Sequence, residues 1–384
     1  MKIIQLRKIG VILASTVLAV GLLTGCETKE QVEEEPVVLD LNVGDSSEEV
    51  VEEASEEVEE EFVEGKYRSE LTNEWIDQEL KSQRPIAVMV DNEITALDHY
   101  GVNQGDVVYE MMNSTMNGRI TRLMVLIKDW EKIERLGSIR STRPTNVLCS
   151  WEWNAILIHD GGPFYINDYI DNERTDHLSG GFARFSNGKS MEFTEYVTYE
   201  DYSNPTTGKS FDGLKDRLAN SNIDTEYNSY YLGPHFKFAK GHNDYTSDAN
   251  AQDAMEIDLP FTHNESKLIY NEETKKYEYY EYNKPHIDAG DNNEVTSFEN
   301  VIVISMDFTK YDENGYLIYN DTAGNKKGYY LTEGTAIPIF WLKNSSYDIM
   351  NFYTDTDKQD LYLNTGKTYI AYVPSDSWED VEIK

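Results

Sequence analysis

Basic residues and cysteines are scarce in this 384-residue sequence. Lys and Arg number 34 against 70 Asp and Glu, which gives a formal net charge of −36. Because so acidic a chain repels phosphate backbones, we expect no nucleic-acid partner. The 2 cysteines are Cys26 and Cys149. The histidines show no pair at the spacing of helical metal ligands, so the sequence predicts neither a metal site nor a cofactor.

Recognisable catalytic motifs are also missing. Gly-Lys-Ser/Thr occurs at 188–190, 208–210 and 366–368, but no glycine stands five residues earlier, as a phosphate-binding P-loop requires. Residues 186–189 fit the S-x-x-K spacing of penicillin-recognising enzymes, yet Asn-Gly between the serine and the lysine favours a turn over a helix. There is no G-x-S-x-G elbow. Whether the protein is an enzyme stays open.

The N-terminus is typical of an exported lipoprotein. Lys2, Arg7 and Lys8 precede an apolar run over 9–23, and Leu-Thr-Gly-Cys ends at Cys26. This ending resembles the lipobox of bacterial lipoproteins. The resemblance implies that 1–26 is a lipoprotein signal peptide, cleaved before Cys26, and that the sulfur carries a lipid with fatty-acyl chains such as palmitate. The alternative is an uncleaved transmembrane anchor. Either way, the sequence predicts a protein held at the outer face of the cytoplasmic membrane.

The segment that follows predicts an acidic, disordered tether over 27–65. Residues 27–64 hold 17 Asp and Glu and a single Lys, with almost no aromatic residue to bury. Such a chain repels itself and stays extended. Once Cys26 carries lipid, Cys149 has no partner for an intramolecular disulfide, and we expect it to be a buried structural thiol.

The remaining residues predict an α+β protein of two domains. An N-terminal α/β domain over 80–245 mixes strand-like runs at 84–91, 106–115 and 119–128 with a helix after residue 143. A polar stretch at 242–253 is a candidate boundary. Residues 254–384 then predict a smaller antiparallel β domain, a sandwich or a barrel, with most of its tyrosines in core packing rather than on a sugar-stacking face.

Polar side chains gather where the N-terminal strands end. Polar groups at strand ends are well placed to line a crevice at the edge of a sheet. The candidate ligand-binding residues are Asp91, Asn92, Glu110, Arg119, Arg122, Arg140, Ser141, Arg143, His159, Gly161 and Gly162.

The helix start within this set has an unusual cap. Proline favours the first helical position, which makes Pro144 that residue and Arg143 the N-cap. An arginine side chain has no acceptor with which to cap backbone amides. These amides, Arg140, Arg143 and Ser141 would then converge on an anion. The alternative is that the arginines pair with Asp91 and Glu110 inside the domain.

Several segments resemble the YerB-like bacterial lipoproteins, whose two parts are domains of unknown function. The N-terminal segments are RPIAVMVDN, QGDVVYE with GRITR, IRSTRP and ILIHDGG, and the C-terminal ones are KPHIDAG, NVIVISMDF and LNTGKTYIAYVP. The resemblance implies a lipid-anchored envelope protein of two domains with no established activity. Residues 171–250 match loosely, so their role stays open.

Three functions follow as hypotheses. The first is a binding module whose arginines hold an anionic cell-envelope ligand, such as a carboxylated peptidoglycan piece or a phosphate-bearing polymer. The second is an envelope glycan hydrolase or transferase that uses Glu110 and Asp91 with His159 as acid or base. The third is a scaffold that binds another envelope protein through residues 254–384.

Overall fold

The computed structural model describes residues 62–324 and 326–384. The predicted signal peptide, the predicted lipidation site at Cys26 and nearly all of the predicted acidic tether lie outside these residues. These described residues form one compact unit. Across the described segments, no helix has the length and apolar character needed to cross a membrane.

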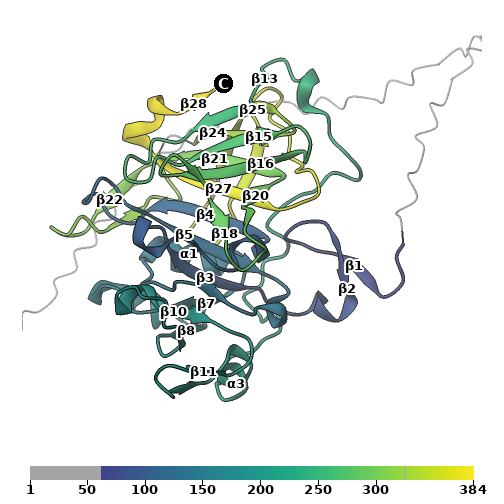
Figure 1. Cartoon of the computed structure of the whole chain (residues 1–384). Helices are drawn as coiled ribbons and strands as arrows, with labels where there is room; N and C mark the ends of the chain where they lie inside the picture. The colour runs from purple at the N-terminus through teal and green to yellow at the C-terminus, as the bar shows by residue number, and fades with distance from the viewer. Residues whose placement is uncertain (1–61, 325) are drawn as a thin grey trace, which may run out of the picture. The chain divides into compact units, whose positions relative to one another are not determined.

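One mixed sheet of eleven strands forms the centre of this unit and runs from β25 near the top of Figure 1 to β8 near the bottom. In order across the sheet, its strands are β13 (Gln252–Asp253), β25 (Thr335–Leu342), β24 (Lys327–Thr332), β21 (Asn300–Met306), β27 (Thr368–Pro374), β4 (Val107–Met112), β5 (Thr121–Ile127), β3 (Ile86–Asp91), β7 (Ile156–His159) and β8 (His177–Ser179), with β26 (Asn351–Thr354) paired to β25.

The sheet takes strands from both halves of the sequence. The strands β3, β4 and β5 confirm the three runs predicted in the N-terminal half. The structure departs from a purely antiparallel C-terminal half at β27, which pairs in parallel with β21 on one side and with β4 on the other. Without β27, the outer N–H and C=O groups of β4 would be unpaired. The strand β27 therefore covers an edge that the N-terminal half would otherwise expose.

A second, six-stranded antiparallel sheet packs on one face of the first. Its strands are β17 (Lys284–Pro285), β16 (Lys276–Glu281), β15 (Lys267–Asn271), β14 (Glu256–Asp258) and β28 (Glu382–Ile383), with β20 (Ser297–Phe298) paired to β16. Inward-facing Tyr277 and Tyr279 share a core with Val88, Val125 and Val303 of the main sheet. The predicted packing role of strand tyrosines is confirmed at these positions.

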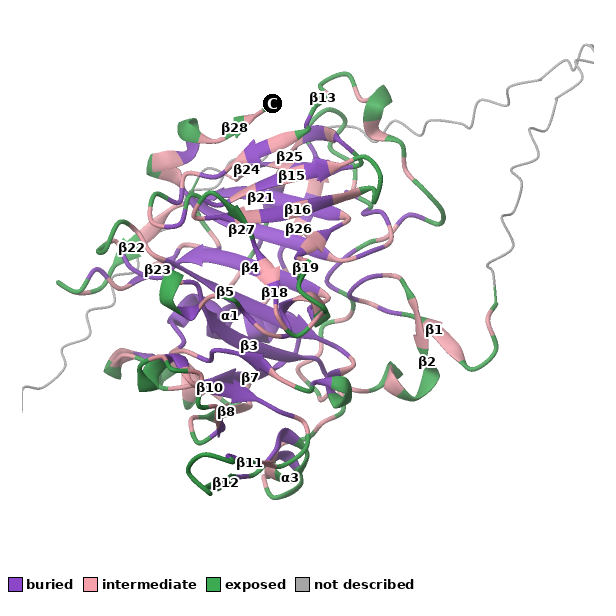
Figure 2. Ribbon diagram, viewed as in Figure 1, coloured by how far each residue is buried: buried purple, intermediate pink, exposed green. Residues whose placement is uncertain are grey.

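The opposite face of the main sheet packs against α1 (Pro144–Glu152). Alternate residues of each central strand point to this side, so Met89 and Ile302 join Val147, Leu148 and Cys149 in a second core. Figure 2 shows the buried central strands between the two covering layers. Cys149 is buried, as expected of a structural thiol.

Helices are few, so the N-terminal half is built mainly of strands. The other α-helices within the described residues are short: α2 (Asn167–Ile170) and α3 (Leu214–Ala219). Small ribbons complete the fold: β1 (Lys66–Arg68) with β2 (Trp75–Asp77), β6 (Leu136–Gly137) with β10 (Glu195–Val197) and β9 (Ala183–Arg184), β11 (Tyr202–Ser203) with β12 (Ser210–Phe211), β18 (Ile287–Asp288) with β19 (Glu294–Val295), and β22 (Phe308–Lys310) with β23 (Leu317–Tyr319).

Candidate functional site

The segment from Ile139 to Arg143 lies across the ends of two strands of the main sheet. The Arg140 N–H donates to Met89 O of β3 at 3.0 Å, and the Thr142 N–H donates to Gly161 O beyond β7 at 3.1 Å. These bonds place Arg140, Ser141 and Arg143 beside the His159–Gly162 turn. The predicted meeting of these two segments at the sheet edge is therefore present.

The start of α1 agrees with its prediction. Arg143 is the N-cap in extended geometry, with φ −130° and ψ 163°, and Pro144 is the first helical residue. The Arg143 side chain does not cap the helix. Instead, Asn146 Oδ1 accepts the Arg143 N–H at 3.0 Å, which is one half of a capping box.

Arg122, Arg140 and Arg143, which we call the arginine cluster, surround this helix start. Arg122 donates to Ser141 O at 2.5 Å, and Arg143 donates to Thr142 O at 2.8 Å. The Arg143 guanidinium also lies 4.0 Å from the centroid of the Tyr316 ring. Arg140 pairs with Asp91, with Nε 2.6 Å from Oδ2, and with Glu192 at 3.1 Å.

Two of these three cations are buried without a counter-ion. Arg122 is 8% exposed and Arg143 is 6% exposed. Neither forms an ion pair with a carboxylate of the described chain. Burial, followed by the charge of Arg143, lowers the pKa of Arg122 to about 9. Burial also lowers the pKa of Arg143. Both guanidinium groups stay charged at neutral pH, so the cluster is locally under-neutralised in a strongly acidic protein.

A pocket of about 210 Å³ opens beside the cluster; of the three arginines, Arg140 lines it and Arg122 and Arg143 do not. Arg140 and Ser141 line it together with Asp160, Arg184 and Glu192. Arg184 is paired with Glu195 at 2.6 Å. Drug-sized ligands occupy about 300–1,000 Å³, so this space suits one carboxylate or phosphate group rather than a whole saccharide.

Asp91 and Glu110 lie on opposite faces of the main sheet and do not form a carboxylate pair. Asp91 is on the α1 side with Arg140. Glu110, fully buried, faces the second sheet, where it accepts hydrogen bonds from Thr121 at 2.7 Å and Tyr279 at 3.0 Å. Its other donors are Asn92, Asn264, Ser266 and Tyr369. The predicted pairing of arginines with Asp91 and Glu110 is therefore right for Asp91 and wrong for Glu110.

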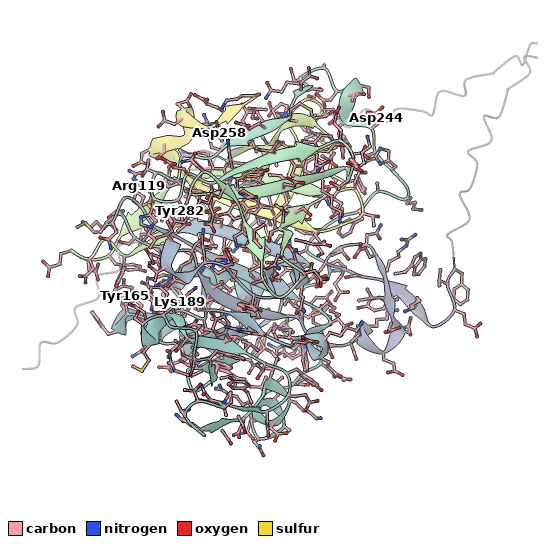
Figure 3. All side chains as sticks on the ribbon, viewed as in Figure 1. Arg119, Tyr165, Lys189, Asp244, Asp258 and Tyr282 are labelled. Atoms are coloured by element: carbon pink, nitrogen blue, oxygen red, sulfur yellow. The ribbon has the colours of Figure 1, made fainter. Side chains whose placement is uncertain are left out.

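Arg119 and Asn92 also lie away from the cluster. Arg119, which is labelled in Figure 3, makes a two-pronged ion pair at 2.7 Å with Asp376 near the C-terminus. Asn92 belongs to the hydrogen-bond network around Glu110. The strand-end pattern that brought both into the predicted crevice does not reveal which face of the sheet a side chain occupies.

His159 lies beside the Arg140–Arg143 segment in a histidine pair. Its Nε2 is 3.0 Å from His177 Nδ1, and its Nδ1 is 2.8 Å from Gly161 O. Burial lowers the pKa of His159 to about 4. The ring is therefore neutral at physiological pH, and both of its nitrogens are engaged. This arrangement does not favour a role as proton donor to a substrate.

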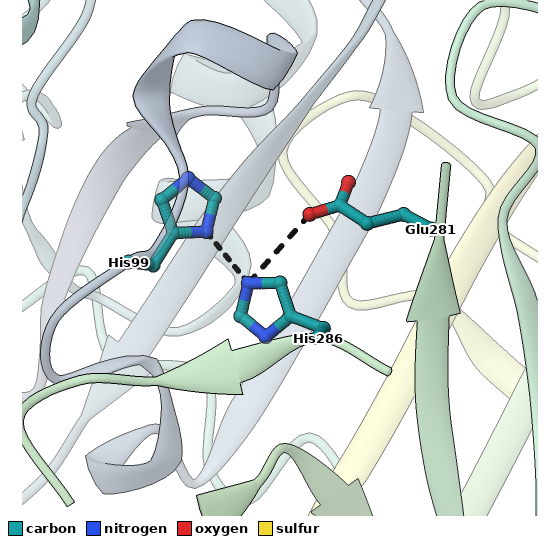
Figure 4. Close-up of side chains that lie close together, drawn as sticks. All are labelled: His99, Glu281 and His286. Atoms are coloured by element: carbon teal, nitrogen blue, oxygen red, sulfur yellow. Dashed lines mark hydrogen bonds and ion pairs between the residues drawn. The ribbon is translucent and has the colours of Figure 1, made fainter. Parts of the chain in front are cut away.

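The structure also brings together three side chains of metal-binding types that the sequence did not predict as a group. His99, Glu281 and His286 meet between the main sheet and the β16–β18 segment (Figure 4). His286 belongs to the KPHIDAG segment, and Glu281 follows Tyr277 and Tyr279 in the inward-facing register of β16. That register could have marked Glu281 as a buried carboxylate. Nothing in the sequence around His99 marks it.

Comparisons with known proteins match both halves of the chain. Residues 71–212 match the family model described as "Protein of unknown function (DUF3048) N-terminal domain", and residues 257–370 match its C-terminal domain. The chain is 22% identical over 314 residues to "Putative lipoprotein YerB" of Bacillus subtilis. The aligned residues cover 80% of this chain and 87% of that protein.

A solved structure shares the fold. The crystal structure of YerB protein from Bacillus subtilis superposes with a TM-score of 0.66 at 18% sequence identity. The match covers 83% of this chain and 99% of the YerB chain. At this identity, the likeness supports the two-part, strand-rich fold alone.

Proposed function

Because this chain belongs to the YerB-like family with DUF3048 N- and C-terminal domains, we propose that it is a lipid-anchored protein which binds an anionic cell-envelope group through its arginine cluster. The predicted lipobox supports a place at the outer face of the cytoplasmic membrane. There the tether would hold residues 62–384 above the bilayer and within reach of envelope polymers.

One observation carries the proposal: Arg122 and Arg143 are buried guanidinium groups without a carboxylate ion pair in the described chain, and they lie next to Arg140, which lines the pocket. A buried, unpaired charge is unfavourable by several kcal/mol in folded proteins. An anion bound at Arg140 would add negative charge beside these two groups without touching them, and charge-assisted hydrogen bonds to guanidinium groups are about twice as strong as neutral ones.

The lining of the pocket limits which anions could bind there. Arg140 lines the pocket while paired with Asp91, and Asp160 and Glu192 also form part of its wall. Two carboxylates at the wall disfavour a dense polyanion, because like charges repel across a small site. We therefore expect a single terminal carboxylate or phosphate, such as the end of a peptidoglycan stem peptide.

The glycan-cleaving alternative loses its basis because Asp91 and Glu110 lie on opposite faces of the sheet. Retaining and inverting enzymes need two carboxylates about 5–10 Å apart across one substrate. The scaffold alternative remains a prediction for the C-terminal half.

The test measures retention of the purified full chain on isolated cell walls. We expect Arg140→Ala/Arg143→Ala to lower retention at least about tenfold, because losing one or two charged hydrogen bonds weakens binding by about 1.5–3 kcal/mol each. Arg119→Ala is the matched control, since Arg119 pairs with Asp376 outside the cluster. Equal retention of the double variant and the wild type from low to high salt would overturn the proposal.

A further inference from the structure

His99, Glu281 and His286 converge from two distant parts of the chain. His99 Nδ1 lies 2.7 Å from His286 Nε2, and Glu281 Oε1 lies 3.8 Å from the same His286 nitrogen. One donor atom of each side chain falls within 4.8 Å of the other two. Figure 4 shows the two rings and the carboxylate directed at this common point.

The carboxyl group of Glu281 is buried and poorly satisfied. Glu281 is 1% exposed, and neither of its oxygens has a hydrogen-bond partner of good geometry in the described chain, because Tyr279 and Asn264, which approach it, donate to Glu110. His99 and His286 are 0% and 2% exposed. Burying a carboxyl group without a partner is unfavourable. A bound cation that accepts both carboxylate oxygen and imidazole nitrogen as ligands would offset this cost of burial.

Second-layer contacts orient the donors. Thr296 Oγ1 lies 2.8 Å from His286 Nδ1, which directs Nε2 toward the centre of the group. Asp288 accepts the N–H groups of Gly101 at 2.9 Å and Asn103 at 2.7 Å, and so fastens the loop that carries His99 to the loop that carries His286. Orientation of a ligating histidine through its second nitrogen is a regular feature of metal sites.

We propose that His99 Nδ1, Glu281 and His286 Nε2 form a binding site for a divalent transition metal ion, with Zn²⁺ the best match. Two imidazoles and one carboxylate are a zinc donor set, and three protein ligands leave a fourth tetrahedral position for water. Ligand atoms about 2.0–2.1 Å from Zn²⁺ stand about 3.3 Å apart in a tetrahedron. The observed spacings to His286 Nε2 of 2.7 Å and 3.8 Å lie on either side of that value, and all three donor atoms lie within 4.8 Å of one another, so shifts of the side chains would seat the ion.

The ion would join the two family domains close to a large pocket. His99 belongs to the N-terminal family domain and precedes β4. Glu281, at the end of β16, and His286 belong to the C-terminal family domain. The neighbours Tyr100, Ala289 and Gly290 line a pocket of about 690 Å³. Metal binding would therefore hold in place the loops that shape this pocket. The inference does not depend on the arginine cluster, which occupies the other face of the main sheet.

The chain contains a matched control. His159 and His177 also form a histidine pair, 3.0 Å between ring nitrogens, but no carboxylate completes a three-donor group there. His177→Gln therefore removes a paired histidine without touching the proposed site. Glu281→Gln keeps the shape of the Glu281 side chain and removes the ligand oxygen charge.

The experiment strips the full chain with a chelator, reloads it with Zn²⁺, removes unbound metal by gel filtration and measures zinc per chain. We expect about one tightly held Zn²⁺ in the wild type and in His177→Gln, and below about a tenth in Glu281→Gln and His286→Gln. Adding Zn²⁺ should raise the thermal midpoint of the wild type and leave that of Glu281→Gln unchanged. All variants carry the same acidic tether, so weak zinc binding there cancels in the comparison.

Substituting Co²⁺ for Zn²⁺ in the wild-type chain tests the site even if a variant fails to fold. Co²⁺ in the wild-type chain should give the intense visible bands of tetrahedral coordination. Two results would overturn the proposal: equal zinc in the wild type and Glu281→Gln, or a wild type that binds no zinc and shows no cobalt bands. The second result would make the group a hydrogen-bonded histidine pair beside a neutral carboxyl.

Discussion

Glu152 illustrates how this protein keeps a buried carboxylate charged. Its oxygens lie 2.7 Å from Lys343 Nζ and 2.9 Å from His235 Nε2, and the Met350 N–H donates to it at 2.9 Å. Burial alone would raise the pKa of Glu152, but Lys343 and His235 outweigh burial and hold it at about 2. Glu152 therefore stabilises the folded state above its ordinary pKa of 4.5.

Glu152→Gln should destabilise the protein by about 3–5 kcal/mol at pH 7, because Lys343 then keeps only Asp321 as a partner. The wild type should lose stability as pH falls from 4.5 toward 2, the range over which the unfolded carboxyl protonates before the folded one. The variant should lack that part of the slope. Urea unfolding between pH 7 and pH 3 measures both effects.

The control at this scale is Asp355→Asn, which breaks the exposed pair with Lys358 and should leave the urea midpoint unchanged. A Glu152→Gln variant as stable as the wild type at every pH would contradict the assignment of Glu152 as a charged structural group.

At the scale of elements, the helix α1 depends on one side chain at its start. Arg143 cannot cap the helix, so Asn146 supplies the acceptor for the Arg143 N–H. Asn146→Ala should lower the free energy of unfolding by about 1–2 kcal/mol, as the loss of a cap does in other proteins. The helix also positions Arg143, so the variant should weaken cell-wall retention together with stability.

The measurement is chemical unfolding followed by the retention assay. Asn250→Ala, at an exposed asparagine far from α1 in sequence, should change neither result. Full stability of Asn146→Ala would show that Pro144 and packing of α1 alone determine where the helix begins.

At the scale of the whole molecule, β27 connects the two family domains. It comes from the end of the chain and pairs in parallel with β21 and with β4. A fragment of residues 62–250 would lack β27 and expose the edge of β4. We expect it to give a collapsed NMR spectrum and to aggregate, because an uncovered central strand edge pairs with other chains.

Co-expression of residues 62–250 with 251–384 should restore a dispersed spectrum and a single species in gel filtration. A soluble, well-dispersed spectrum from residues 62–250 alone would show instead that the N-terminal half folds by itself. The predicted boundary near 242–253 would then also be a boundary of folding.

Most of the strands and the position of α1 were predictable, whereas the face occupied by each polar side chain was not. Runs such as IAVMVD and TRLMVLI are buried on both sides, so their composition marks a strand without indicating which residue faces which layer. Asp91 ends β3 as predicted, whereas Glu110, predicted to end its strand, lies inside β4, and strand register places the two on opposite faces. Register depends on the partner strands, which the local sequence does not specify.

The sequence by itself determined the features that depend on local chemistry. These are the acidic net charge, the strand runs, and the start of α1 at Pro144, where proline geometry selects the first helical residue. Only the tertiary structure decided which charges meet. It paired Arg119 with Asp376, left Arg122 and Arg143 without an ion pair to any carboxylate among residues 62–324 and 326–384, and brought His99 to Glu281 and His286. Such meetings arise from sheet pairing between distant segments, and no local pattern encodes them.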